Sequence, residues 1–478
     1  MLGKIGSIEK SDEIIKNTID KITSREVEIS RITKTVLVID EAQDIDQDEF
    51  NLINALIDQN EDMRVIAVGD DDQNIFEFRG ASSKYLEQFI RVKQAVKHEM
   101  VDNYRSKCNL VHFSNQFVKS IRYRLKENPI IPKQTDIGKI KLVRYQSENL
   151  ITPLVQDILI SGLTGTTCVL TKTNEEALQI SGLLLKNGMP AKLIQTNDGF
   201  SLFNLAEIRF FLSKLNFADD VYVISDEDWA DAKRALMNKF AKSNKLEICT
   251  NIIRDFEATN PKRKYKSDIE FFIRESKLED FFNENAETIL VSTIHKAKGK
   301  EFDNVFLLLE NIYPTTDEAK RQLYVAMTRA IQNLTIHLNS NFLDNIKVEN
   351  LLRIDNKGTY IPTSEIILQL YHKDVNLGYF EFIQHRIENI FSGESLKIGK
   401  DGCANSSNDL VLKFSKKFLE SKEILESKGY LLKGAKVNFI VFWWNDETEK
   451  EVKIVLPELH FEKEKQNLIH SNSLQKDC

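Results

Sequence analysis

Short apolar segments alternate with amphipathic segments along most of the first 340 residues. The apolar segments predict strands at 35–39, 65–68, 168–171, 191–194, 288–292, 304–309 and 334–338. Between them, apolar residues recur at helical spacing, most clearly at 50–58, 175–185 and 205–215. Strands that alternate with helices indicate parallel α/β sheets, and strands that are apolar throughout indicate sheets covered on both faces.

Four other regions follow different patterns. Residues 8–32 read as a charged helix, and the charged segment 216–287 reads as a helical insertion between strands. Its basic cluster PKRKYK, 261–266, indicates either phosphate binding or a solvated helix face. Beyond about residue 341 the α/β alternation stops; we expect 363–430 to be mostly helical and 437–442 with 452–456 to form a β-hairpin.

Composition and charge narrow the class of protein. Of 478 residues, 42% are hydrophobic and 29% are charged, which is typical of a folded globular chain. The net charge of −7 argues against a globally basic nucleic-acid coat. The five cysteines are scattered without a CxxC pair, and we see no secretion signal or membrane-spanning segment. We therefore expect a cytoplasmic protein.

Polar motifs directly follow several of the predicted strands, where parallel α/β proteins place their functional residues. The first strand is followed by DEAQD, in which Asp40 and Glu41 are suited to a metal–phosphate site or form a solvated acidic turn. The second is followed by GDDDQNIFEFRGA, whose Phe76 and Phe78 either stack on bases or belong to the core. Three further blocks come later: NYRS at 103–106, TIHKAKGKEF at 293–302 and QLYVAMTRA at 322–330.

Taken in this order, the five blocks resemble motifs II to VI of the superfamily 1 DNA helicases of the UvrD/Rep/PcrA type. The resemblance covers roughly residues 34–340. It implies two RecA-like lobes that close around ATP and move single-stranded DNA in the 3′–5′ direction. The fold class that we expect is therefore α/β, with a partial first lobe, a complete second lobe and a C-terminal α+β module.

The resemblance also implies a role for each motif residue. Asp40 would hold Mg²⁺ and Glu41 would be the catalytic base. The other residues expected in hydrolysis are Gln43, Gln73, Arg105 and Arg329. Those expected to contact the nucleotide are Asp40, Tyr104, Gly299 and Glu301, and those expected along the DNA are Phe76, Phe78, Arg79, Thr293 and His295.

From these assignments we predict four segments. The partial first lobe would span 1–130, and the second lobe 131–340 with its insertion at 216–287. The C-terminal module would span 341–462, followed by a disordered tail at 463–478. In this module, the stretch LGYF at 377–380 and the segment VNFIVFWW…KIVLPELHF resemble, with low specificity, the ends of long bacterial RecQ-like helicases. Trp443 and Trp444 either bind a base or a partner or belong to the core.

The phosphate-binding motif of the family, GxxxxGK[ST], does not occur in the sequence. We expect the first sheet to lack strands and to expose apolar surface on one side. Three explanations stay open: the chain is the C-terminal part of a longer helicase, one half of a split enzyme, or a degenerate member. The preferred function is the motor portion of an ATP-dependent DNA helicase in repair or recombination; the rival is a non-catalytic DNA-binding or interaction subunit.

Overall fold

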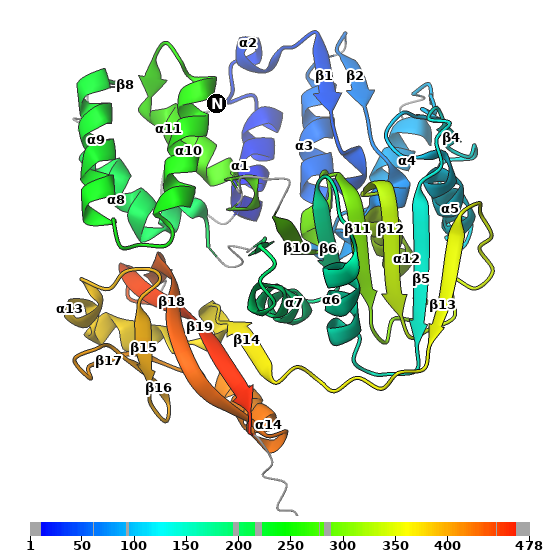
Figure 1. Ribbon diagram of the computed structural model, residues 1–478. Helices are drawn as coiled ribbons and strands as arrows, with labels where there is room; N and C mark the ends of the chain where they lie inside the picture. The colour runs from blue at the N-terminus through cyan, green and yellow to red at the C-terminus, as the bar shows by residue number, and fades with distance from the viewer. Residues whose placement is uncertain are drawn as a thin grey trace, which may run out of the picture. The chain divides into compact units, whose positions relative to one another are not determined.

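The structure, a computed structural model, divides into two compact units, which we describe separately (Figure 1). Unit 1 comprises Met1–Leu150, Ile160–Lys172 and Thr293–Tyr360, and unit 2 comprises Ile151–Leu159, Thr173–Ser292 and Ile361–Cys478. The residues that the structure describes are 11–60, 62–91, 95–194, 200–215, 222–276, 278–281, 288–445 and 447–464.

Unit 1 begins with a small parallel sheet of two strands, β1 (Val36–Ile39) and β2 (Arg64–Ala67). The helices of this region are α1 (Ser11–Thr23), α2 (Ile29–Ile32), α3 (Gln47–Asp58) and α4 (Ser83–Arg91). Helix α3 starts at a capping box, in which the Asp46 carboxylate accepts from the Glu49 N–H. Phe50 of α3 and Tyr85 of α4 pack on one face of this sheet with Ile39. The sheet is thus covered by helices on that face.

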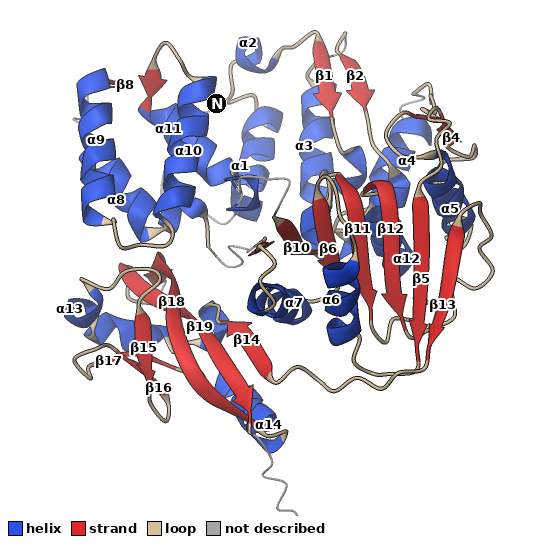
Figure 2. Ribbon diagram, in the orientation of Figure 1, coloured by secondary structure: helices blue, strands red, loops and turns tan. Residues whose placement is uncertain are grey.

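The larger sheet of unit 1 contains parallel strands in the order β13-β5-β12-β11-β6 (Figure 2). These strands are β5 (Lys139–Tyr145), β6 (Thr167–Thr171), β11 (Phe302–Leu309), β12 (Ala330–Leu338) and β13 (Leu351–Asn356). The unit also contains α5 (Cys108–Val118), α12 (Asp317–Met327) and the short parallel pair β3 (Asp102–Asn103) and β4 (Ile131–Pro132). Nearly all residues of β6 and β11 are buried, so this part of the sheet is covered on both faces.

Unit 2 combines helices with a six-stranded antiparallel sheet, ordered β14-β19-β18-β15-β16-β17. Its helices are α6 (Ile151–Ile160), α7 (Asn174–Lys186), α8 (Ala206–Lys214), α9 (Asp226–Lys239), α10 (Leu246–Thr259), α11 (Lys266–Glu275), α13 (Gln384–Ile387) and α14 (Lys416–Ser427). The sheet strands are β14 (Glu365–Gln369), β15 (Ser395–Ile398), β16 (Gly402–Ala404), β17 (Leu410–Lys413), β18 (Tyr430–Asn445) and β19 (Lys450–Lys463). Strand β7 (Ala191–Leu193) pairs with β10 (Ile289–Thr293) in parallel, and β8 (Val223–Ile224) forms a two-stranded antiparallel sheet with β9 (Lys264–Tyr265). One core cluster joins α8–α11 to the antiparallel sheet, with Phe211, Phe256 and Phe439 among its fully buried side chains.

The α/β class and the strands predicted before residue 340 are confirmed, with strand ends shifted by a few residues. The predicted hairpin is also confirmed and is longer than expected, since β18 pairs with β19 from Tyr430↔Lys463 to Asn445↔Lys450. Two expectations were wrong. The α/β pattern does not stop at 341, because β13 extends the parallel sheet, and 363–430 is not mostly helical, because it contains four strands.

Three smaller expectations had different outcomes. The helix expected at 8–32 is interrupted, since α1 ends at Thr23 and α2 starts at Ile29. Most of the cluster 261–266 is not on a helix: Lys264 and Tyr265 form β9, and only its last residue, Lys266, begins α11. The disordered tail predicted at 463–478 lies, beyond Glu464, outside the described residues. The predicted segment boundaries stay a prediction.

Candidate nucleotide and nucleic-acid site

The acidic pair lies where the sequence places it, at the carboxyl end of β1. Asp40 is exposed, and its Oδ1 accepts a hydrogen bond from the Glu41 N–H at 2.9 Å. Glu41 has a φ of 50° and a ψ of 40°, a left-handed conformation that non-glycine residues rarely adopt. Such strain is often retained at functional positions, where it fixes the direction of a side chain. The Glu41 side chain is 63% exposed and therefore accessible to a ligand.

Gln43 joins the ends of β1 and β2. It is fully buried; its Nε2 donates to Glu41 Oε2 at 2.5 Å, and its Oε1 accepts from the Asp70 N–H at 2.9 Å. Gly69 permits this approach, because a Cβ at that position would lie 2.6 Å from Gln43 Oε1. Gln43 therefore orients Glu41, the candidate base, and at the same time holds the end of β2 through the Asp70 N–H.

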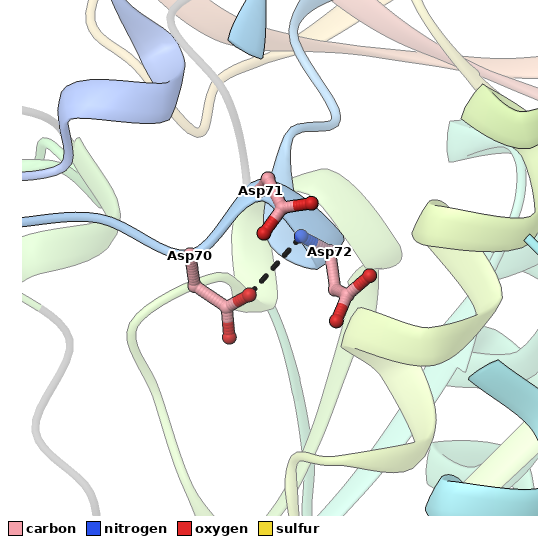
Figure 3. A group of neighbouring side chains, drawn as sticks. All are labelled: Asp70, Asp71 and Asp72. Carbon is pink, nitrogen blue, oxygen red and sulfur yellow. Dashed lines mark hydrogen bonds between the residues drawn. The ribbon is translucent and has the colours of Figure 1, made fainter. Parts of the chain in front are cut away.

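Three consecutive aspartates follow β2 and bring their carboxylates together (Figure 3). Asp70 Oδ1 accepts from the Asp72 N–H at 3.0 Å, and Asp72 forms two 2.7 Å hydrogen bonds with Arg124. Lys126 lies 2.6 Å from Asp70 and 3.1 Å from Asp72. Burial alone would raise the pKa of Asp72, but Arg124 and Lys126 hold it below its ordinary value, whereas burial raises the pKa of Asp71. Arg124 and Lys126 already neutralise Asp70 and Asp72, and Asp71 accepts a hydrogen bond from the Leu125 N–H. We therefore assign the three aspartates to fixing the strand end rather than to binding a metal.

Arg329 is buried and continues the polar network from this strand end. Its Nη2 donates to Gln73 Oε1 at 3.1 Å, and Gln73 Nε2 donates to Asp70 Oδ2 at 2.8 Å. Burial, and then repulsion by Arg105, lowers the pKa of Arg329 to about 10, so it remains charged at neutral pH. A buried cation with most of its hydrogen bonds made to neutral oxygens is well placed to receive an anion.

Arg105 forms an ion pair with Glu301, and both side chains are 37% exposed. The preceding Tyr104 is 71% exposed, which leaves its ring free to pack on a ligand. A cavity of about 110 Å³ lies beside these groups and is lined in part by Asp70, Gln73 and Arg105. Gly299, also predicted at the nucleotide, has a φ of 80° in the turn before β11.

The two phenylalanines of the second motif form an aromatic group with a histidine from a distant part of the sequence. The Phe76 and Phe78 ring centroids are 6.1 Å apart and lie 6.2 and 5.7 Å from that of His295. Phe78 is 64% exposed, Phe76 is half-buried, and the Arg79 guanidinium lies 5.3 Å from the Phe76 ring centroid. Burial, and then the charge of Arg79, lowers the pKa of His295, and its buried Nε2 has no partner among the described residues. The remaining predicted contact, Thr293, is buried at the end of β10.

The structure therefore brings together the hydrolysis candidates Glu41, Gln43, Gln73 and Arg329, with Arg105 beside Arg329. Sequence reasoning missed Arg124 and Lys126, which hold the three aspartates. The available signal was the basic run RYRLK some 20 residues beyond NYRS, opposite in charge to DDD. It also missed Lys298, which lies inside a quoted motif and pairs with Asp44 at 2.5 Å. The roles assigned to the predicted residues stay predictions.

These features define an α/β protein whose polar network lies at the carboxyl ends of parallel strands. The family model described as the UvrD-like helicase C-terminal domain matches residues 98–222 and 216–341, and that of the UvrD/REP helicase N-terminal domain matches 12–94. The chain belongs to the UvrD-like helicase family.

Three relatives illustrate the extent of the similarity. The chain is 22% identical to Gabija protein GajB of Bacillus cereus over 66% of this chain and 68% of that protein. It is 26% identical to the ATP-dependent DNA helicase PcrA of Leuconostoc citreum, over 44% of this chain and 29% of the relative. It is 22% identical to DNA helicase II of Haemophilus influenzae, over 68% and 59% of the respective lengths.

One solved structure, described as the C-terminal domain of a possible DNA helicase from Lactobacillus plantarum, covers 52% of this chain and 98% of its own, with 15% identity and a TM-score of 0.28. Within the described ranges, none of the helices has the length and apolarity needed to cross a bilayer.

Proposed function

We propose that this chain is the motor portion of an ATP-dependent DNA helicase or translocase that moves along single-stranded or partly duplex DNA in the 3′–5′ direction, in repair or recombination. The observation that carries the proposal is the hydrogen-bonded path Glu41–Gln43–Asp70–Gln73–Arg329. It links the acidic end of β1 to a buried arginine from a distant motif. Family membership supports the same function.

In this proposal the residues have distinct tasks. Asp40 offers the carboxylate oxygen that Mg²⁺ prefers, at an exposed strand end, and the ion would neutralise phosphate charge. Glu41 orients and deprotonates the attacking water. Arg329 and Arg105 stabilise the negative charge that develops on the γ-phosphate.

The aromatic group formed by Phe76, Phe78 and His295 would contact the DNA. Exposed Phe78 offers a ring face on which a base can stack, a contact worth about 1–3 kcal/mol. The buried Nε2 of His295, which has no partner among the described residues, offers a polar contact beside that ring. Lys298 links this aromatic group to the nucleotide candidates, because its Nζ lies 5.1 Å from the Phe76 ring centroid and 3.6 Å from Glu41 Oε2. A motor that couples the two sites requires such a link.

The phosphate cradle would come from a polypeptide segment outside the printed sequence, whether covalently joined or a separate chain. The support is the second face of the small sheet, where Val36, Val38, Ile66 and Val68 are 43–61% exposed. Parallel strands are normally buried on both faces, so this surface is suited to a covering segment with further strands and helices.

The rival function is a non-catalytic DNA-binding or interaction subunit. It is favoured by the sequence itself, which contains four Gly-Lys pairs but none followed by Ser or Thr. It predicts DNA binding without turnover under every condition. The motor proposal instead predicts turnover once a P-loop segment is supplied.

ATP hydrolysis distinguishes the two functions. The chain would be assayed with and without single-stranded DNA, alone and joined to the N-terminal P-loop segment of a UvrD-like relative, with Glu41→Gln as the blank. We expect DNA-stimulated turnover only in the completed protein, and a fall of about 10³-fold with Arg329→Ala. Turnover by the chain alone that is lost in Glu41→Gln would contradict the missing cradle. A completed protein that binds DNA and ATP without turnover would support the rival.

A further inference from the structure

Unit 2 contains a cavity of about 310 Å³ that none of the motifs accounts for. It is bounded on one side by α8 and α9, and on the other by the loop 388–391 and by strands β18 and β19. The second set of elements lies beyond residue 341, where the family-model matches end. The helical region and the C-terminal sheet therefore both contribute to the wall of the cavity.

Aromatic rings form much of its wall. The centroids of Phe210 and Phe240 are 5.5 Å apart, and those of Phe240 and Phe391 are 5.8 Å apart. Phe240 is buried and supports the other two rings, which are half-buried and keep part of their surface open. Phe442 of β18 contributes a fourth half-buried ring. Such rings offer flat apolar faces to a planar ligand.

Cations stand over these rings. The Lys239 Nζ lies 4.3 Å from the Phe210 centroid, and no ion pair with a described residue neutralises it. Lys453 reaches the same cavity, with its Nζ bonded to the carbonyls of Ile387 and Glu388 at 3.0 and 3.1 Å. Burial, and then the charge of Lys239, lowers the pKa of Lys453. Two lysines that repel each other at the edge of an aromatic cavity favour an anion between them.

One of the positive charges in the cavity, that of Arg209, is already neutralised and is not available to a ligand. Arg209 is held by Glu451 at 2.6 and 2.8 Å while lying 5.4 Å from the Phe442 ring centroid. Glu388 is the one acidic residue among those that line the cavity. The free positive charge therefore belongs to Lys239 and Lys453, beside the rings of Phe210 and Phe391.

We propose that this cavity binds one nucleotide unit of a single-stranded nucleic acid, with its base against Phe210 and Phe391 and its phosphate at Lys239. A purely apolar ligand would leave the charge of Lys239 without a partner among the described residues, and a simple inorganic anion would make no use of the rings. A base with its phosphate uses both. The inference rests on the proposed function in so far as that function makes nucleic acid the substrate; it adds a second contact outside the motor motifs.

The test is binding of a fluorescein-labelled oligothymidylate to the full chain by anisotropy, over a range of salt concentrations. Lys239 is exposed, so Lys239→Glu should fold normally. It should weaken binding at least about fivefold and lower the salt slope by about 0.7, the value for one phosphate contact on a single strand. Phe391→Leu keeps apolar volume but removes the ring, and should weaken binding about fivefold or more. Arg234→Glu, the same charge change on the same helix but outside the cavity, is the matched control and should bind as the wild type does.

The proposed DNA contact at Phe78 is tested in the same assay, so that a failure of this contact can be distinguished from a failure of the cavity proposal. If Phe78→Ala binds as the wild type does while Lys239→Glu is impaired, the motor contact fails and the cavity stands. If Lys239→Glu and Phe391→Leu both bind as the wild type does, the cavity proposal is overturned. An oligonucleotide carrying 5-iodouracil should cross-link to peptides containing Phe210 or Phe391. If the oligonucleotide does not cross-link to these peptides but a photoreactive ATP analogue does, the cavity binds a free nucleotide. That result would overturn the proposal of a single-stranded nucleic acid.

Discussion

The two parallel sheets of unit 1 have similar apolar strands but different surroundings. Leu307 in β11 is fully buried, as are nearly all residues of that strand. Val38 in β1 is 61% exposed, although VLVI is as apolar as the FLLL of β11. Since strands that are apolar on both faces are typical of sheets covered on both sides, the small sheet has the sequence of a buried element without a complete cover in the described chain. Apolar pattern predicts that a strand needs burial, but it does not say which segment provides it.

The small sheet is held in place by polar contacts at its carboxyl end as well as by helices on one face. Gln43 joins the strand ends, and Asp72 anchors β2 to Arg124 and Lys126 through short charged hydrogen bonds. The larger sheet is stabilised chiefly by burial. The two sheets should therefore respond in opposite ways to loss of apolar burial and to loss of charge.

The largest effect is expected for Leu307→Asp in the larger sheet. Its side chain is fully buried in the central strand β11, so the new carboxylate would lose hydration without gaining a partner. We expect a loss of at least about 4–5 kcal/mol, enough to leave much of unit 1 unfolded. Circular dichroism with urea titration measures this loss. Leu307→Met, which conserves volume, should cost less than about 1.5 kcal/mol and serves as the control. A native-like urea midpoint for Leu307→Asp would mean that β11 is not a central buried strand.

A smaller loss is expected for Asp72→Asn in the small sheet. The substitution leaves Arg124 and Lys126 without their buried carboxylate, and breaking a buried pair costs about 3–5 kcal/mol. Asp71→Asn is the matched control, since its pKa is raised by burial and an amide oxygen can still accept from the Leu125 N–H. We expect Asp71→Asn to be neutral or slightly stabilising. Equal losses in the two variants would contradict the assignment of Asp72 as the anchor.

The same pair predicts a pH dependence. The folded-state pKa of Asp72 lies below its unfolded value, so its stabilisation is complete above about pH 4 and is lost as the pH falls through the folded pKa. The raised pKa of Asp71 acts in the opposite sense, since its protonation on acidification favours the folded state. As the pH falls towards about 4, the unfolded-state value, the unfolding free energy of the wild type should therefore rise relative to that of Asp71→Asn, and below about pH 4 the two should fall in parallel. A loss of wild-type stability relative to Asp71→Asn as the pH falls towards 4 would contradict the raised pKa of Asp71.

The sequence predicted β1, β2, β6, β11 and β12 because each is a short apolar run that ends at a polar turn. It also placed Asp40, Glu41 and Gln73 after the ends of strands, because the polar turns that contain them directly follow the apolar runs. It missed β5, because charged residues interrupt the apolar ones in KIKLVRY. It could not predict β13, because LLRIDN lies at an exposed edge and is largely polar outside its first residues. It missed β14–β17 because short strands such as SLKI and GCA carry too few residues to show a period of two. It missed the pair Arg124–Asp72 because two oppositely charged runs 52 positions apart do not show which of their residues meet.

The smallest effect on stability, and the sharpest test of the comparison, is expected for Val38→Asp. Because this side chain is largely exposed, the change should alter the unfolding free energy by no more than about 0.5 kcal/mol. In the protein completed by a P-loop segment the same carboxylate would be buried without a partner, so DNA-stimulated ATP turnover should be lost. Thr35→Asp, an equally charged change at an exposed position just before β1, should preserve that turnover. If Val38→Asp unfolds the chain by itself, as Leu307→Asp is expected to, then both faces of the small sheet are already covered within this chain. If it preserves turnover in the completed protein, the added segment does not cover this face.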